Sequence, residues 1–132
     1  MAAWYETEKG MNRMLLEREL LEHDFPQMTM GETPNKEIVV CGYIGPGNEL
    51  SRAYWVEAVY PHNYGNGNSI DVYLPEEDLP WNTPHVYSTS EGHICITHGR
   101  DWKPDCTISD ALGWIRAWLQ LYEEFRRTGA TW

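Results

Sequence analysis

The strongest constraint on the fold is a pair of short β-branched and aromatic segments joined by a tight turn. Residues 37–44 read EIVVCGYI and residues 52–60 read RAYWVEAVY, with Gly-Pro-Gly-Asn at 45–48 between them. Such residues favour strands, and a turn this short sets two strands side by side in opposite directions. A third segment of this kind, residues 69–74, follows a turn-rich stretch. The sequence therefore predicts an antiparallel meander of three strands.

Two predicted helices flank these strands in the sequence, one before them and one after them. Residues 7–23 carry apolar residues near helical spacing, and the proline at 26 stops the helix. We expect the apolar stripe to be buried and the opposite, charged face to be solvated. The stripe consists of Met11, Met14, Leu15, Leu16, Leu20 and Leu21, and the charged face of Glu6, Lys9, Arg13, Glu17, Arg18 and Glu22.

The second helix is predicted to begin at Thr107 and to end at Gly129. Thr107, Ser109 and Asp110 are favourable first-turn residues, and glycine commonly ends a helix. Before this helix, residues 75–84 are rich in proline and acid, and residues 85–105 form a long loop with one apolar patch at 94–96. The order predicts a single α+β domain over residues 1–132. The expected buried face comprises Leu112, Ile115, Trp118 or Leu119, Tyr122 and Phe125.

The net charge excludes two classes of partner. Ten Lys and Arg against twenty Asp and Glu give a formal charge of -10. Nucleic-acid binding and attraction to anionic membranes both depend on basic residues, so we expect neither partner. The N-terminus lacks a basic stretch followed by an apolar one, and no apolar run approaches the roughly 20 residues of a membrane span. We therefore expect a cytoplasmic protein whose acidic surface prefers a basic protein partner.

The three cysteines need separate interpretations. An odd number without regular spacing does not fit a secreted disulfide framework. Cys41 lies in an apolar strand and is expected in the core. Cys95 lies between two isoleucines, and in isolation that setting favours a buried, inert thiol.

The surroundings of Cys95 change this interpretation. Residues 92–96 read Gly-His-Ile-Cys-Ile, and residues 102–108 read Trp-Lys-Pro-Asp-Cys-Thr-Ile at the start of the predicted helix. Both segments resemble those of the ubiquitin-conjugating enzyme (E2) family, which carries Gly-x-Ile-Cys-Leu followed by Trp-x-Pro-x-x-Thr-Ile. The order of helix, strands and helix resembles the family over essentially the whole chain. The resemblance implies a UBC-like fold, a long active-site loop and a catalytic Cys95. It also implies a core position for Cys106, which stands at a buried aliphatic position of the family.

The chain also departs from the common E2 pattern. Thr83 stands where the family has the His of its His-Pro-Asn tripeptide, and His85 stands where it has the Asn. The two C-terminal helices of the family are expected to be missing. With these traits the sequence looks most like the shortened bacterial E2-like proteins of type II CBASS antiviral operons. Those proteins act on a cyclic-GMP-AMP-synthase-like nucleotidyltransferase and join its C-terminus to target lysines.

The resemblance implies a thioester mechanism without a cofactor. Cys95 would accept the C-terminus of the nucleotidyltransferase, with an activating enzyme as a further possible partner, and pass it to a lysine amine. His85 would order the loop, polarise the thioester carbonyl or accept a proton from the lysine. Supporting roles are open to His93, His98 and Asp101, of which Asp101 could orient a histidine. The basic residues of the first helix are mixed with glutamates, which predicts weak docking to an ordinary activating enzyme.

Other interpretations remain open at this point. A non-catalytic E2-like (RWD-type) scaffold would keep the fold and only bind a partner; the tripeptide change favours it, and the context of Cys95 opposes it. A thiol peptidase or redox enzyme lacks a second cysteine near Cys95. The positions His93, Cys95, His98 and Cys106 do not have the paired spacing of a structural zinc site, so no metal is expected.

Overall fold

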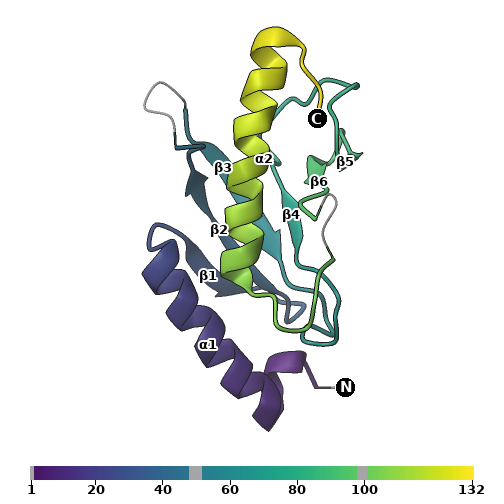
Figure 1. Ribbon diagram of the computed structural model, residues 1–132. Coiled ribbons are helices and arrows are strands. Elements are labelled where there is room, and N and C mark those ends of the chain that lie inside the picture. The colour runs from purple at the N-terminus through teal and green to yellow at the C-terminus, as the bar shows by residue number, and fades with distance from the viewer. Residues whose placement is uncertain (1, 48–51, 98–100) are drawn as a thin grey trace.

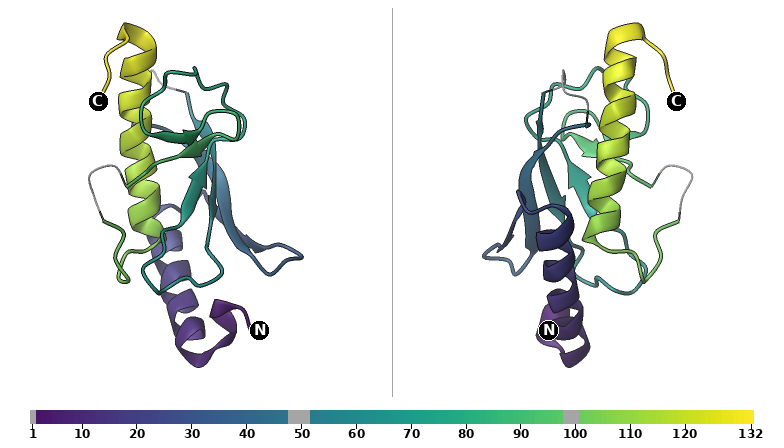
Figure 2. Two further views of the ribbon diagram at one scale, coloured as in Figure 1. Left: turned by 90° about the vertical axis from the view of Figure 1, so that its right-hand side faces the viewer. Right: turned by 60° about the vertical axis from the view of Figure 1, so that its left-hand side comes forward.

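The protein is a six-stranded antiparallel sheet with a long helix, α2 (Ile108–Thr128), along one face (Figure 1). The computed structural model describes residues 2–47, 52–97 and 101–132. A second helix, α1 (Glu8–Asp24), lies beside the N-terminal end of α2 and extends past the sheet (Figure 2). The predicted α+β order of helix, antiparallel strands and helix is confirmed. The other elements are the short 3-10 helix η1 (Trp4–Glu6) and the strands β1 (Thr29–Glu32), β2 (Ile38–Ile44), β3 (Tyr54–Val59), β4 (Asp71–Tyr73), β5 (Val86–Ser88) and β6 (His93–Ile94).

The three predicted strands correspond to β2, β3 and β4. Their registers place Val40 opposite Ala58 and Ala58 opposite Val72, and all three side chains are fully buried beneath α2. Alternate residues of β2 and β3 are buried, as expected for a sheet covered on one face. The predicted turn at 45–48 ends at Asn48, which lies outside the described residues.

Three further strands complete the sheet in the order β1-β2-β3-β4-β6-β5. The expectation that residues 85–105 form only loop is therefore wrong: β6 pairs with β4, and β5 pairs with β6. Strand β5 has three residues and β6 has two, and both are too short for an alternating pattern to show in the sequence. Because β6 is part of the sheet, Cys95 lies directly after a strand and not within an open loop.

The long helix α2 has the predicted bounds and the predicted buried face. The Asp110 carboxylate accepts a hydrogen bond from the Thr107 main-chain nitrogen at 2.7 Å, which satisfies one free N–H group at the start of the helix. Gly129 ends the helix in the left-handed conformation, with φ 80°, and donates to the Phe125 carbonyl. The buried residues of α2 are Ile108, Ala111, Leu112, Ile115, Trp118, Leu119, Tyr122 and Phe125.

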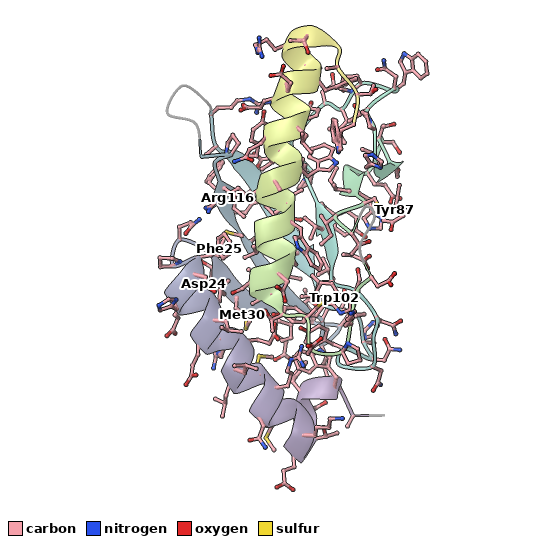
Figure 3. All side chains as sticks on the ribbon, viewed as in Figure 1. Asp24, Phe25, Met30, Tyr87, Trp102 and Arg116 are labelled. Carbon is pink, nitrogen blue, oxygen red and sulfur yellow. The ribbon has the colours of Figure 1, made fainter. Side chains whose placement is uncertain are left out.

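The orientation of the first helix is predicted only in part, since Leu21 is buried as expected but much of the apolar stripe is not. Met11 and Leu15 are 51% and 59% exposed, whereas Glu17 is fully buried. The part of the stripe formed by Met11, Leu15 and Leu16 therefore faces solvent, whereas Leu21 is buried and Met14 and Leu20 are half-buried. The helix packs through Leu21 and Glu17. Arg116 of α2 lies over the ring of Phe25 at 5.1 Å and joins the two helices at the end of α1 (Figure 3). None of the helices that the structure describes is long and apolar enough to cross a membrane.

Candidate functional site

Cys95 directly follows β6, and its main chain is tied to the neighbouring strand. The Cys95 nitrogen donates a hydrogen bond to the carbonyl oxygen of His85 at 3.0 Å, just before β5. The thiol is free and partly exposed. Gly92 shapes the turn into β6: its φ is 68°, and a Cβ there would lie 2.4 Å from the Leu74 carbonyl oxygen. Glycine at position 92 is therefore a steric requirement of the backbone beside the cysteine.

A small aromatic pocket lies next to Cys95. It has a volume of about 60 Å³ and is lined mainly by residues of α2 together with Trp132 from the C-terminal segment. Trp118 is 4% exposed, and its buried indole nitrogen has no hydrogen-bond partner in the described part of the chain. The cysteine therefore adjoins an apolar hollow that can hold a few atoms of a bound chain. The lining residues are Cys95, Ile96, Trp114, Ala117, Trp118, Leu121 and Trp132.

His85 contributes its backbone to Cys95, while its side chain contacts Trp132. The imidazole Nε2 lies 2.7 Å from the main-chain oxygen of Trp132, and the two rings are 5.7 Å apart. His85 has φ 54°, a left-handed conformation that is uncommon for a residue other than glycine. The structure therefore brings His85 to the site, as predicted, with its ring directed toward the C-terminal segment.

His93 lies in an aromatic stack beside the site. Its Nε2 is 3.2 Å from the Asp71 carboxylate, and its ring stacks on Tyr73 at 4.5 Å. The ring of Tyr87 packs against the other side of the cluster, 4.8 Å from His93. Asp71 thus holds the histidine, the role that the sequence suggested for Asp101.

Tyr87 is the site residue that the sequence interpretation missed. The neighbouring Cys95 thiol, together with partial desolvation, raises the pKa of Tyr87. The influence of Thr97 on this pKa is in the opposite direction. The tyrosine projects from β5 at the edge of the sheet (Figure 3). Because β5 could not be recognised from the sequence, nothing placed residue 87 beside residue 95.

The other predicted residues do not join this group. His98 lies outside the described residues. Asp101 is exposed, and among the described residues it makes no hydrogen bond or ion pair that would orient a histidine. The core positions expected for Cys41 and Cys106 are wrong, because both side chains are partly exposed. In residues 2–47, 52–97 and 101–132, no cluster of His, Cys, Asp or Glu could hold a metal ion.

A buried ion pair holds the segment between Cys95 and α2. Arg13 of α1 donates to the carbonyl oxygens of Pro104, at 2.9 Å, and Cys106. Glu17 accepts from Arg13 Nε at 2.9 Å and from the main-chain nitrogen of Ile108 at 2.8 Å. The same carboxylate accepts from the hydroxyl groups of Tyr60 and Tyr64, at 2.8 and 2.9 Å. We name Arg13, Glu17, Tyr60 and Tyr64 the Glu17 clamp.

The tryptophan of the motif before α2 serves packing. Trp102 contacts Trp114 edge-on at 5.8 Å and lies 6.5 Å from the ring of Tyr64. Both tryptophans are partly buried against the core. The segment at 102–108 is thus held by aromatic contacts as well as by the Glu17 clamp, which fixes the start of α2 relative to Cys95.

The comparisons with known proteins agree with this arrangement. A family model described as "Type II CBASS E2 protein" matches residues 17–132. No curated protein and no solved structure matches the chain. The matched range begins at the buried Glu17 and includes the whole sheet, Cys95 and α2.

Proposed function

Because this chain belongs to the type II CBASS E2 family, we propose that Cys95 is the acyl carrier of a conjugation reaction. Membership of the family implies an E2-like role in a CBASS antiviral operon. The choice of Cys95 depends chiefly on one observation: its free, partly exposed thiol lines the aromatic pocket beside α2. Cys41 and Cys106 do not line that pocket.

The proposed reaction has two steps. In the first, the Cys95 thiolate attacks an activated acyl group at the C-terminus of a partner protein, supplied as an acyl adenylate or as a thioester on an activating enzyme. A C–S bond forms, and AMP or the thiolate of the activating enzyme leaves. In the second, a neutral lysine amine attacks the thioester carbonyl; a C–N bond forms, the C–S bond breaks, and Cys95 leaves as a thiolate. The nitrogen loses one proton to solvent or to a base.

The donor that we propose is the C-terminus of a cyclic-GMP-AMP-synthase-like nucleotidyltransferase. The pocket beside Cys95 is small and apolar, which suits the last atoms of an extended chain better than a folded surface. The charge of -10 supports a protein partner with a basic surface, and we expect their association to slow as salt rises.

Histidine has a limited part in this proposal. The carbonyl of His85 holds the Cys95 backbone, so His85 orders the loop through its main chain whatever its ring does. Because its Nε2 faces the Trp132 oxygen, which can only accept, Nε2 carries the hydrogen, and Nδ1 would be the atom that accepts a proton from the lysine. His93 supports the site indirectly, through Tyr87.

The alternative is a non-catalytic E2-like scaffold. The observation that favours it concerns His85, which stands at the position of the family's catalytic asparagine. Its ring contacts Trp132. In that case the aromatic pocket and α2 would bind a partner chain without forming a covalent bond.

Mass spectrometry of the protein co-expressed with its genomic neighbours tests the carrier role. We expect a partner C-terminus attached to Cys95, released by thiol treatment, and a stable oxygen ester in Cys95→Ser. Cys41→Ser and Cys106→Ser are matched controls that should keep the thioester. Absence of any adduct on the wild-type protein under activating conditions would favour the scaffold.

A second variant tests the proton role of His85. We expect His85→Ala to form the adduct at a nearly normal rate and to transfer it to lysine more slowly, because only the second step needs a proton acceptor. An unchanged rate of transfer would remove the His85 ring from the mechanism and leave its main-chain contact as its contribution.

A further inference from the structure

Residues 129–132 fold back beside the end of α2 and bring Trp132 to the aromatic pocket next to Cys95 (Figure 1). We name these four residues the C-terminal strap. The chain reverses at the left-handed glycine that ends α2, and the first three strap residues are exposed. Trp132 is half-buried, and its ring lies 5.7 Å from the ring of Trp118 and 6.3 Å from that of Phe125. The strap is therefore held on the domain mainly through one aromatic side chain.

The strap also contacts His85 through its main chain. The imidazole Nε2 lies 2.7 Å from the main-chain oxygen of Trp132, and because that oxygen can only accept, the imidazole donates. The carbonyl oxygen of His85 in turn accepts from the Cys95 nitrogen at 3.0 Å. Directly beside the candidate nucleophile, the domain thus binds a peptide segment by one main-chain oxygen and one large apolar side chain.

We propose that the C-terminal strap occupies the binding site of the donor chain, and that the donor displaces it by placing a large apolar side chain where the Trp132 ring lies. This inference rests on the proposed function, which brings the C-terminus of a partner protein to Cys95. With Trp132 in place, the pocket has a volume of about 60 Å³, which is too small for a second large side chain. The strap and the donor therefore exclude each other, and the donor is an extended segment with an aromatic or large aliphatic residue near its end.

The exchange is close to balanced because the donor remakes the contacts that the strap loses. Release of the strap breaks its hydrogen bond with His85 and uncovers Trp118, which is 4% exposed with the strap in place. A donor carbonyl oxygen can accept from His85 again, and an aromatic side chain can cover Trp118 again. A glycine or alanine in that place covers little apolar area and leaves the Trp118 ring in water. The pocket therefore selects donor chains by the size of one residue.

The strap has an advantage over a free peptide. Because the strap belongs to the same chain, its effective concentration at the pocket is of the order of millimolar. A free peptide competes poorly with it, whereas a donor tail presented by a docked partner also acts at a high effective concentration. Removal of the Trp132 ring should therefore open the site to short peptides in solution.

Protection of Cys95 from a bulky maleimide, followed by mass spectrometry, tests the inference on the isolated Trp132→Ala protein. The probes are two unreactive tripeptides, acetylated and amidated, of sequence Gly-Ala-Trp and Gly-Ala-Ala. At several millimolar, we expect the tryptophan peptide to slow alkylation of Cys95 about threefold or more and the alanine peptide to leave the rate unchanged. Neither peptide should change the rate in the wild-type protein, where the strap fills the site.

Two further variants separate the ring of the strap from its hydrogen bond. Trp132→Phe keeps an aromatic ring, so Cys95 should react at close to the wild-type rate and be insensitive to both peptides. His85→Ala removes the hydrogen bond and keeps the ring, so it should show the same preference for the tryptophan peptide with a smaller effect. Cys41, on β2 and outside the pocket lining, is the internal reference, and urea unfolding checks that each variant is folded.

Equal effects of the two peptides on Trp132→Ala would overturn the inference, as would an effect of the tryptophan peptide that is just as large in wild type. Because the peptides carry no activated acyl group, the result is independent of whether an adduct on Cys95 is found. An adduct on Cys95 without peptide selectivity would leave the carrier role intact and show that the strap does not occupy the donor site.

Discussion

The carboxylate of Glu17 lies 2.8 Å from the main-chain nitrogen of Ile108 and accepts its hydrogen bond across 91 positions of sequence. It joins the first helix to the start of the last one. A carboxylate at a helix N-terminus is stabilised by the free N–H groups and by the helix dipole. Here that carboxylate is fully buried and also neutralised by Arg13.

We expect Glu17→Gln to lower the free energy of unfolding by about 2–4 kcal/mol, because it leaves Arg13 without its counter-charge in a buried site. Urea denaturation at neutral pH measures the change. Glu19→Gln, an exposed position on the same helix, is the matched control and should change stability by less than about 0.5 kcal/mol. Equal stabilities for the two variants would contradict the importance of the Glu17 clamp.

Stability should fall at alkaline pH through the buried tyrosines. Burial raises the pKa of Tyr54 to about 12 and raises the pKa values of Tyr60 and Tyr64 as well. The unfolded chain releases these protons from about pH 10. The stability is therefore fully present below pH 10 and is lost between pH 10 and 12. Urea denaturation at pH 9 and pH 11 measures this loss of stability, and Tyr54→Phe should make the loss smaller. A free energy of unfolding that is the same at both pH values would refute the prediction.

Two glycine substitutions should have opposite effects. Gly92→Ala places a Cβ 2.4 Å from the Leu74 carbonyl oxygen at φ 68°, so we expect a loss of several kcal/mol, of the order of 2–4. Gly113→Ala, inside α2 with nothing within 4 Å of the added carbon, should stabilise by about 0.5–1 kcal/mol. Thermal unfolding compares them. A Gly92→Ala protein as stable as the wild type would show that the turn before Cys95 can rearrange freely.

Trp132 should limit access to Cys95. Its ring lines the pocket and contacts Trp118 edge-on at 5.7 Å. We expect Trp132→Ala to speed the reaction of Cys95 with a bulky maleimide about threefold or more, with a smaller effect on iodoacetamide, because the larger reagent needs more of the pocket. Trp81→Ala, at an 89% exposed position, is the control. If the ratio of the maleimide rate to the iodoacetamide rate is the same in wild type and Trp132→Ala, the tryptophan does not restrict access to the thiol.

The fold could be predicted from the sequence where the apolar residues that form a local pattern are also the residues that the structure buries. The α2 face that contains Leu112, Ile115 and Phe125 is apolar at helical spacing and lies on the sheet, so tertiary structure reinforces the local signal. The strands β2 and β3 are long enough for their residue preferences to show. The sequence context singles out Cys95 as the candidate nucleophile, a role that stays a prediction, and the structure places that cysteine beside the aromatic pocket.

The errors arose where contacts distant in sequence override the local pattern. The orientation of α1 is set by Tyr60, Tyr64 and Ile108, which supply donors to Glu17 from residues far along the chain. Burial of a glutamate cannot be inferred from α1 itself, because its partners lie elsewhere. Tyr87 was missed for a related reason: β5 exists only because β6 pairs with it.

The Glu17 clamp also determines when the domain can be completed during synthesis. Its acceptors and donors include Pro104, Cys106 and Ile108, so α1 emerges from the ribosome long before the groups that hold it. Until then Arg13 and Glu17 remain hydrated, and the early chain has a charged helix that water can solvate. The contacts between α1 and the start of α2 can therefore form only after all six strands between them have been synthesised.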